Sequence, residues 1–208
     1  IDWPRPESRL QIGMSFETLG LSAPLLKAVE DYFEPTSVQE AAIPVILTGV
    51  DVIATAQTGS GKTTAYVLPL LQRWLSVPKE DSRSLHTLVL VPTRELAAQV
   101  REVLQECSAH LAKHLKVVSA VGGASINPQM MALRGGADFI VATPGRLLDL
   151  VEHNAVQLTR IRSLVLDEAD RMLNLGFAEE VSRVLKLLPV GRQNVLMSAT
   201  FPDSVESL

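Results

Sequence analysis

Short apolar runs alternate with longer helical patterns along most of the 208-residue chain. Each short run is rich in Val, Ile, Leu or Ala and lacks regular polar alternation, which is typical of a strand buried on both faces of a sheet. The expected strands are residues 51–55, 87–91, 117–121, 138–142, 163–167 and 194–198. The expected helices are residues 62–75, 94–111, 128–134, 146–153 and 177–188.

This alternation predicts a single α/β domain in which a parallel sheet has helices on both faces. Ligands of such sheets bind at the carboxyl ends of the strands. The chain has no internal repeat, no low-complexity tract and no composition shift after Gly13. We therefore expect residues 1–13, which lack periodicity and contain Pro4 and Pro6, to be a flexible leader and residues 14–208 to form the domain.

Composition narrows the class of protein. A hydrophobic content of 47% is enough for one core, and no apolar run is long enough to span a membrane. The single cysteine, Cys107, excludes an internal disulfide, fits a reducing cytoplasm and lies in a helical pattern that favours a small buried hydrophobe over a nucleophile. The formal net charge of −4 argues against a nucleic-acid binder that works mainly by charge. It still allows a local groove of helix N-termini and a few arginines.

A glycine-rich loop follows the first expected strand and opens a helix. From Ala56 to Thr63 it reads AQTGSGKT, which is the phosphate-loop pattern G-x-x-x-x-G-K-[ST] with Ala56 in place of the first glycine. Gly59 and Gly61 let successive backbone N–H groups point at one anion, and the helix N-terminus adds to that field. Lys62 is placed to reach the β- and γ-phosphates of ATP, and the Thr63 hydroxyl to bind Mg²⁺. The ordinary alternative is a glycine-rich turn with a solvated lysine.

A second candidate site is the acidic end of the expected strand at residues 163–167. Two adjacent carboxylates at a buried strand end repel each other unless a cation compensates. Asp167 is therefore a candidate Mg²⁺ ligand, acting through water, and Glu168 a candidate general base for an attacking water. Alone, the segment could equally be a strand-to-helix loop capped by Asp. The phosphate loop in the same predicted sheet favours the metal site.

These motifs carry a family resemblance. Residues 167–170 read Asp-Glu-Ala-Asp, and the chain from about Met14 onward resembles the first RecA-like domain of the DEAD-box RNA helicases. Segments 122–129 and 142–149 are most similar to the bacterial RhlE-like group. The resemblance implies a RecA-like P-loop NTPase fold in which Ala56 is normal, with ATP and Mg²⁺ as cofactors. It also implies RNA bound through its backbone, local unwinding of RNA duplexes and RNA-stimulated ATP hydrolysis.

Residues 35–39 resemble the family's Q motif. The resemblance makes Gln39 the reader of adenine and Phe16 the upstream aromatic that stacks on the base. A glutamine amide offers one donor and one acceptor, which suits adenine N7 and N6–H₂ and mismatches guanine O6. The sequence departs from the family at Asp31, where glycine is usual, and the interval from Phe16 to Gln39 is shorter than expected. The ordinary alternatives are core packing for Phe16 and helix capping for Gln39.

The resemblance distributes the candidate residues over four roles. The nucleotide-binding set is Phe16, Gln39, Ala56, Gln57, Thr58, Gly59, Ser60, Gly61, Lys62, Thr63 and Thr64, and the catalytic set is Lys62, Asp167 and Glu168. The RNA-backbone set is Pro92, Thr93, Arg94, Gly122, Gly123, Thr143, Pro144, Gly145 and Arg146. Asp170, Ser198 and Thr200 are expected to link nucleotide state to unwinding. Turn formers and helix caps with solvated arginines are the ordinary alternative for the RNA-backbone set.

The resemblance also implies a partner outside this chain: a second RecA-like domain of the same parent protein. That domain supplies the arginine fingers and the other half of the RNA clamp, so we expect the chain to be an excised domain of a longer helicase. No membrane partner is expected. Two rival functions stay open, an ATP-switched binding module and a DNA translocase of the wider superfamily.

Overall fold

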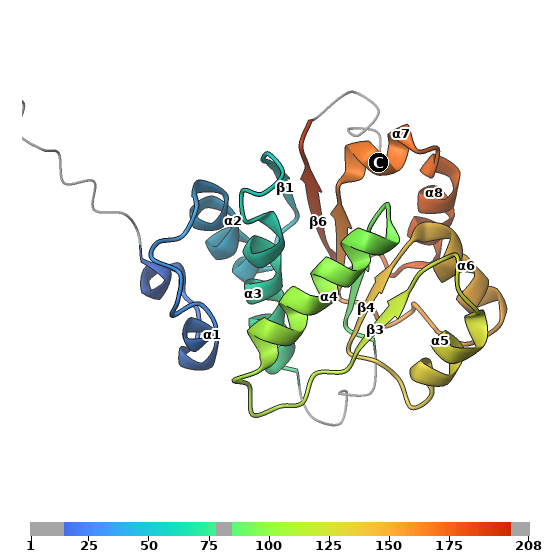
Figure 1. Cartoon of the computed structure of the whole chain (residues 1–208), viewed down its shortest axis with the longest axis horizontal. Helices are drawn as coiled ribbons and strands as arrows, with labels where there is room; N and C mark the ends of the chain where they lie inside the picture. Colours follow the sequence, from blue (N-terminus) through green and yellow to red (C-terminus); the bar gives the residue numbers. More distant parts are fainter. Residues whose placement is uncertain (1–14, 78–84, 201–208) are drawn as a thin grey trace, which may run out of the picture.

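A computed structural model describes residues 15–77 and 85–200, so the expected leader at residues 1–13 lies outside the described part. The described strands form one six-stranded parallel sheet (Figure 1). They are β1 Val52–Thr55, β2 Thr87–Leu90, β3 Val117–Ala120, β4 Phe139–Ala142, β5 Ser163–Asp167 and β6 Gln193–Ser198. Their order in the sheet is β1-β6-β5-β2-β4-β3. The predicted strands are confirmed, with bounds that differ by a residue at most.

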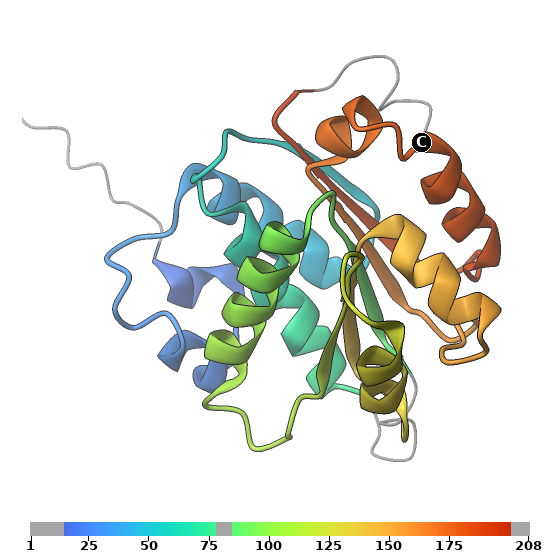
Figure 2. The same cartoon turned by 45° about the vertical axis from the view of Figure 1, so that its right-hand side comes forward.

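Helices cover both faces of the sheet, as predicted (Figure 2). They are η1 Phe16–Leu19, α1 Ala23–Lys27, α2 Ser37–Thr48, α3 Lys62–Leu75, α4 Arg94–Ser108, α5 Ile126–Leu133, α6 Pro144–Glu152, α7 Ala169–Asn174 and α8 Ala178–Leu187. Four of these, η1, α1, α2 and α7, are absent from the expected set. Three of them are too short to show a period, and α2 is apolar on most sides and contains Pro44. None of the described helices is both long and apolar enough to cross a membrane.

The core consists of two hydrophobic clusters, one on each face of the sheet. The first joins α2, α3 and α4 to strand residues such as Val89 and Val165, and the second joins α6, α7 and α8 to Leu88 and Leu164. Successive strand residues point to opposite faces, so both clusters together fix the register. The central strands β2, β4 and β5 are buried along their whole length, which explains their unbroken apolar pattern.

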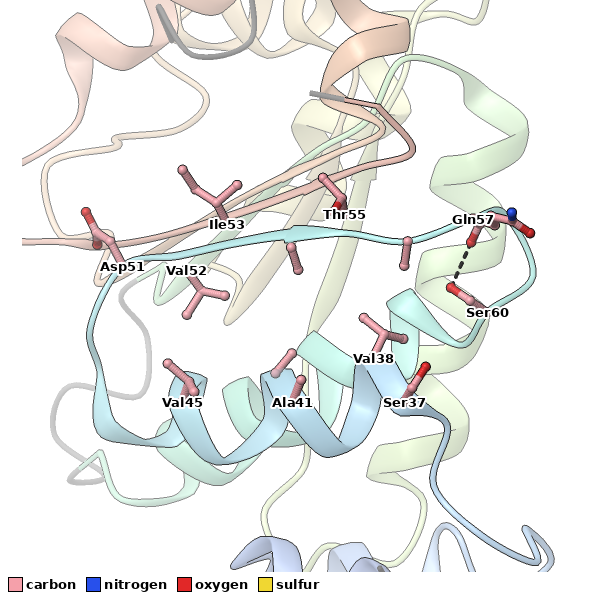
Figure 3. Close-up of a pocket in the computed structure, with 13 residues that line it drawn as sticks. Ser37, Val38, Ala41, Val45, Asp51, Val52, Ile53, Thr55, Gln57 and Ser60 are labelled. Carbon is pink, nitrogen blue, oxygen red and sulfur yellow. Dashed lines mark hydrogen bonds between the residues drawn. The ribbon is translucent and has the colours of Figure 1, made fainter. Parts of the chain in front are cut away.

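The expectation of burial on both faces is wrong for β1. This strand lies at the edge of the sheet and pairs with β6. Val52 lies on the side of α2, whereas Ile53 and Thr55 lie on the opposite side (Figure 3), where Ile53 is 62% exposed. An apolar run shows that a segment is a strand, but it does not show whether a helix covers each face.

Two buried aromatic donors fix α3 against the sheet. The Tyr66 hydroxyl donates to Asp167 Oδ2 at 2.8 Å, at the carboxyl end of β5. Eight positions further along the helix, Trp74 Nε1 donates to Asp138 Oδ1 at 3.0 Å, immediately before β4. Because both aromatic side chains are buried, each polar atom needs a partner inside the protein. The helix that begins at the phosphate loop is therefore held at both ends of the strands.

Cys107 lies on α4 and is buried, as expected. Burial, together with the charge of Glu106, raises the pKa of the thiol to about 12. A thiol with so high a pKa is a poor nucleophile near neutral pH. The prediction of a small buried hydrophobe is confirmed.

His86 predicts a loss of stability in mild acid. Burial lowers its pKa to about 4, and the charges of Arg162, Arg73 and Lys113 act in the same direction. The unfolded chain binds the proton near pH 6.5 and the folded chain only near pH 4, so the free energy of unfolding falls as the pH drops through that window, by up to about 3 kcal/mol. Denaturation at a series of pH values should show this fall, and His86→Gln should reduce it. If the variant loses stability in acid as much as the unmodified chain does, His86 is not the residue responsible.

Candidate nucleotide-binding site

The predicted phosphate loop connects β1 to α3 at the carboxyl edge of the sheet (Figure 3). Gly59 and Gly61 have φ angles of +79° and +88°, in the left-handed region that favours glycine. The Ser60 hydroxyl donates to the Gln57 carbonyl at 2.7 Å, and the backbone N–H of Ala56 donates to the carbonyl at the end of β6 at 3.0 Å. The loop is therefore an ordered turn that is tied to the sheet.

Lys62 is the first residue of α3 and is buried. Among the described residues its Nζ has no hydrogen-bond partner. A buried ammonium without a partner is unfavourable, so this position suits an anionic ligand. The N-terminus of α3 attracts negative charge at the same place. The lysine and the helix together fit a phosphate group.

Asp167 ends β5 and is buried beside this loop. Burial raises its pKa, while the hydrogen bond from Tyr66 and the charge of Lys62 act in the opposite direction. Thr63 is the second residue of α3, and the Tyr66 hydroxyl of the same helix donates to Asp167 Oδ2 at 2.8 Å. The two predicted metal-binding residues, Thr63 and Asp167, are thus brought together by α3 and β5. Oxygen ligands of this kind, combined with phosphate oxygens, are those that Mg²⁺ prefers.

Glu168 adopts a left-handed backbone conformation with φ of +53°, directly before α7. This conformation is unfavourable for a residue with a side chain, by about 1–2 kcal/mol. Its Oε2 accepts a hydrogen bond from Arg171 Nη1 at 3.0 Å. Backbone strain of this kind is concentrated at functional sites, which fits a residue placed for chemistry.

Asp170 connects the acidic segment to the end of β6. Its Oδ2 accepts hydrogen bonds from the backbone N–H and the hydroxyl of Thr200, at 3.0 and 2.8 Å. Its own N–H donates to the Ser198 hydroxyl at 3.4 Å. Burial raises the pKa of Asp170, but the hydrogen bonds from Thr200 and Ser198 outweigh it and lower the pKa overall. The three residues expected to link nucleotide state to unwinding are therefore bonded to one another, while that role stays a prediction.

Gln39 has two contacts inside the protein. Its Oε1 accepts from the Thr36 N–H at 2.9 Å at the start of α2, and its Nε2 donates to the Gly61 carbonyl at 3.3 Å. The helix-capping alternative is thus observed, and the same side chain reaches the phosphate loop. Adenine recognition by Gln39 stays a prediction.

Phe16 lies in the hydrophobic core and not in an open position. It is 7% exposed, and its ring centroid lies 6.4 Å from that of Tyr32. A ring that protein atoms largely cover offers little surface to a base, so this burial favours core packing, and adenine stacking on Phe16 stays a prediction. Two aromatic residues, Tyr32 and Phe33, were not among the residues predicted to contact the nucleotide. They are exposed, Phe33 by 96%, and they precede Gln39 in a segment with no periodicity to reveal exposure.

The expected RNA-backbone residues follow β2, β3 and β4 at the same edge of the sheet. Several have contacts inside the protein. The Thr93 hydroxyl accepts from the Leu96 N–H at 3.2 Å and so caps α4. The Thr143 hydroxyl accepts from the Gly122 N–H at 3.4 Å, which joins the loop after β4 to the loop after β3.

The two arginines of this set differ. The Arg146 side chain is 10% exposed, donates from Nη2 to the Ala124 carbonyl at 2.8 Å and pairs through Nε with Asp149 at 3.4 Å. The Arg94 side chain is 57% exposed. Contacts inside the protein therefore occupy part of the Arg146 guanidinium and hold the loop after β3, and RNA binding by Arg146 stays a prediction.

Comparison with known proteins identifies the family. The family model described as DEAD/DEAH box helicase matches residues 36–208. The chain belongs to this family. The DEAD-box ATP-dependent RNA helicase CshA of Streptococcus pneumoniae serotype 4 is 44% identical over 197 residues, which cover 94% of this chain and 36% of that protein.

Two further relatives are similar to the chain over nearly the same length. The ATP-dependent RNA helicase DeaD of Escherichia coli strain K12 is 43% identical over 196 residues, covering 93% of this chain and 30% of that protein. The probable ATP-dependent RNA helicase ddx27 of Dictyostelium discoideum is 44% identical over 199 residues, covering 93% and 25%. The chain thus spans 25–36% of the length of these relatives. The likeness to the RhlE-like group stays a prediction.

The two left-handed glycines of the phosphate loop predict different costs of substitution. A Cβ at Gly61 would lie 2.6 Å from Gln39 Nε2 and 3.2 Å from Thr36 Oγ1, whereas a Cβ at Gly59 would have no such neighbour within 4 Å. Both alanine variants should lose about 1–2 kcal/mol from backbone strain. Gly61→Ala should lose about 1 kcal/mol more, because it displaces the Gln39 cap. Urea denaturation measures both losses.

Gln39→Ala in the Gly61→Ala background is the matched test. Because it removes the clashing side chain, the double variant should lose less stability than the sum of the losses in the two single variants. A Gly59→Ala variant as unstable as Gly61→Ala would contradict the proposed contact.

Proposed function

We propose that this chain is the ATP-binding domain of an ATP-dependent DEAD-box RNA helicase. In this role it binds ATP with Mg²⁺ and contributes half of an RNA-backbone clamp for local duplex unwinding. The observation that carries the proposal is the buried Lys62 ammonium at the N-terminus of α3, which lies near Asp167 and has no hydrogen-bond partner within residues 15–77 and 85–200. The relatives are named as ATP-dependent RNA helicases, which supports the same activity for the parent protein.

The residues of this chain divide the chemistry between them. The backbone N–H groups of the phosphate loop and the Lys62 ammonium bind the phosphates of ATP. The Thr63 hydroxyl and the Asp167 carboxylate would hold Mg²⁺, which when bound neutralises charge on the phosphate oxygens. Glu168 orients the attacking water and accepts its proton.

The base is recognised, on this proposal, from the first turn of α2 and the segment before it. The Gln39 amide reads adenine through one donor and one acceptor and exchanges its contacts with Thr36 and Gly61 for those with the base. Tyr32 and Phe33 are exposed aromatic residues close to Gln39 in sequence, and they replace Phe16 as candidates for stacking.

The link from ATP to RNA runs through the end of β6. The Ser198 carbonyl accepts from the phosphate-loop N–H of Ala56, and the Ser198 hydroxyl accepts from the Asp170 N–H. The RNA backbone is bound by the exposed Arg94 and by the loops that contain Gly122, Gly123 and residues 143–145, while Arg146 shapes those loops. Contacts of this kind position a nucleic acid without reading its sequence.

A second RecA-like domain of the parent protein completes the proposal. In this proposal residues 14–208 form the first domain. The chain spans 25–36% of the length of the relatives compared above, which leaves room in such proteins for a second domain. It would supply arginine fingers and the other half of the clamp. We place the parent protein in the cytoplasm, which fits a single buried cysteine.

Nucleotide binding tests the proposed site directly. Lys62→Ala should weaken ADP binding about 10- to 100-fold, because hydrogen bonds to charged groups contribute about 1.5–3 kcal/mol. Lys186→Ala, which removes an exposed lysine from α8, is the matched control and should bind as the unmodified chain does. Calorimetry measures both. Equal effects of the two substitutions, or no ADP binding by the unmodified chain, would refute the site.

Turnover tests the need for a second domain. The 208-residue chain alone should release almost no phosphate from ATP, with or without saturating RNA, because an arginine finger contributes about 10³- to 10⁵-fold in related enzymes. The full-length parent should regain RNA binding and RNA-stimulated hydrolysis together, and Glu168→Gln in the parent should lose turnover while keeping ATP binding. Strong RNA stimulation of the chain alone would rule out the two-domain proposal.

A further inference from the structure

Tyr66 is a buried polar residue that the proposed chemistry leaves without a role. It lies one helical turn after Lys62 on α3, and its hydroxyl donates to Asp167 Oδ2 at 2.8 Å. We propose that Tyr66 is a positioning residue for the Mg²⁺–nucleotide complex, which holds the Asp167 carboxylate in one orientation for the metal. This inference rests on the proposed nucleotide site.

The placement of the phenol supports this role. The ring is fully buried in the cluster that packs α3 on the sheet, so its hydroxyl has a fixed position. The hydroxyl donates to Asp167, and Thr63 lies three positions before Tyr66 on the same helix. Tyr66 therefore joins α3, which carries Thr63, to the Asp167 carboxylate at the end of β5. A change in its position would alter the spacing between them.

A phenol suits this task better than a charged donor. A second cationic side chain beside Asp167, in addition to Lys62, would repel a divalent cation and cancel more of the negative charge that attracts it. A neutral hydroxyl occupies one carboxylate oxygen and leaves the net charge unchanged. Outer hydrogen bonds of this kind orient metal-binding carboxylates, and their loss typically weakens metal affinity by about 10–100-fold.

The alternative is that the contact only satisfies a buried carboxylate. The same helix offers a matched case, because Trp74 Nε1 donates to Asp138 Oδ1 at the opposite end of the strands. If both contacts are only structural, loss of either donor should lower stability and leave metal dependence unchanged. If Tyr66 has a positioning role, loss of its donor should also change the Mg²⁺ dependence, whereas loss of the Trp74 donor should not.

The experiment measures the Mg²⁺ dependence of nucleotide binding. A non-hydrolysable ATP analogue is titrated by calorimetry into the unmodified chain, Tyr66→Phe and Trp74→Phe, at increasing Mg²⁺ and in EDTA. Tyr66→Phe should raise the Mg²⁺ concentration for half-maximal tightening by about 10-fold or more and bind the analogue normally in EDTA. Trp74→Phe should melt at a lower temperature and keep the Mg²⁺ dependence of the unmodified chain. The same Mg²⁺ dependence in Tyr66→Phe would overturn the proposal, whatever its melting temperature.

A second measurement avoids substitution at Tyr66. The chain has two tyrosines, so labelling with 3-fluorotyrosine gives one fluorine resonance from Tyr66 and one from the exposed Tyr32. Tyr32→Phe assigns the two signals. Addition of Mg²⁺ to the nucleotide-bound chain should move the Tyr66 resonance, and an unmoved resonance would overturn the proposal.

The experiment distinguishes an error in the proposed nucleotide site from an error in the proposed role of Tyr66. If the unmodified chain does not bind the analogue at all, the proposed nucleotide site is wrong and Tyr66 has no such role. If Mg²⁺ tightens binding equally in the unmodified chain and Tyr66→Phe, the site stands and only the role of Tyr66 is refuted.

Discussion

The burial of α3 against the sheet fixes the position of every group that we expect to contact nucleotide phosphate. Most of its 14 residues are buried, and its first residues carry the ammonium and the hydroxyl of the site. Its packing is non-directional, but the bonds from Tyr66 and Trp74 to carboxylates at opposite ends of the strands are directional. Together they prevent the helix from sliding or rotating on the sheet. A displacement of the helix would separate Lys62 from Asp167, and the phosphate site would be lost.

Hydrogen bonds at the end of β6 fix the position of two further segments at the carboxyl edge of the sheet. Ser198 bonds the phosphate loop through its carbonyl and Asp170 through its hydroxyl, while Thr200 bonds the Asp170 carboxylate. Two segments that are far apart in sequence thus share one strand end as an anchor. On the proposed function, a nucleotide that shifts the phosphate loop would act on Asp170 through Ser198, since this residue bonds both segments.

Much of this arrangement can be predicted from the sequence, because the relevant signals are local. Unbroken apolar runs predicted the central strands, and the glycine-rich loop between β1 and α3 predicted the bounds of that helix. The failures have a common cause, since each depends on what lies across the fold. The exposure of Ile53 depends on which face of an edge strand is covered, and the burial of Phe16 on what packs over its ring. The Tyr66–Asp167 bond joins residues 101 positions apart, and no pattern within either segment indicates it.

The edge of the sheet that we expect to contact RNA offers fewer free positive charges than the proposed nucleotide site requires of Lys62. The chain carries a formal net charge of −4, so attraction at long range does not favour a polyanion. Arg146, one of the two arginines expected to bind phosphate, donates instead to the Ala124 carbonyl and pairs with Asp149. The remaining surface offers Arg94, backbone N–H groups and hydroxyls, which are directional contacts of short range. Such contacts give tight binding only when the RNA strand is already held in the bound conformation. A single contact does not offset the conformational entropy that a flexible strand loses on binding. A single half of the clamp is therefore expected to bind RNA weakly, and a second domain that constrains the strand would strengthen every contact of the first.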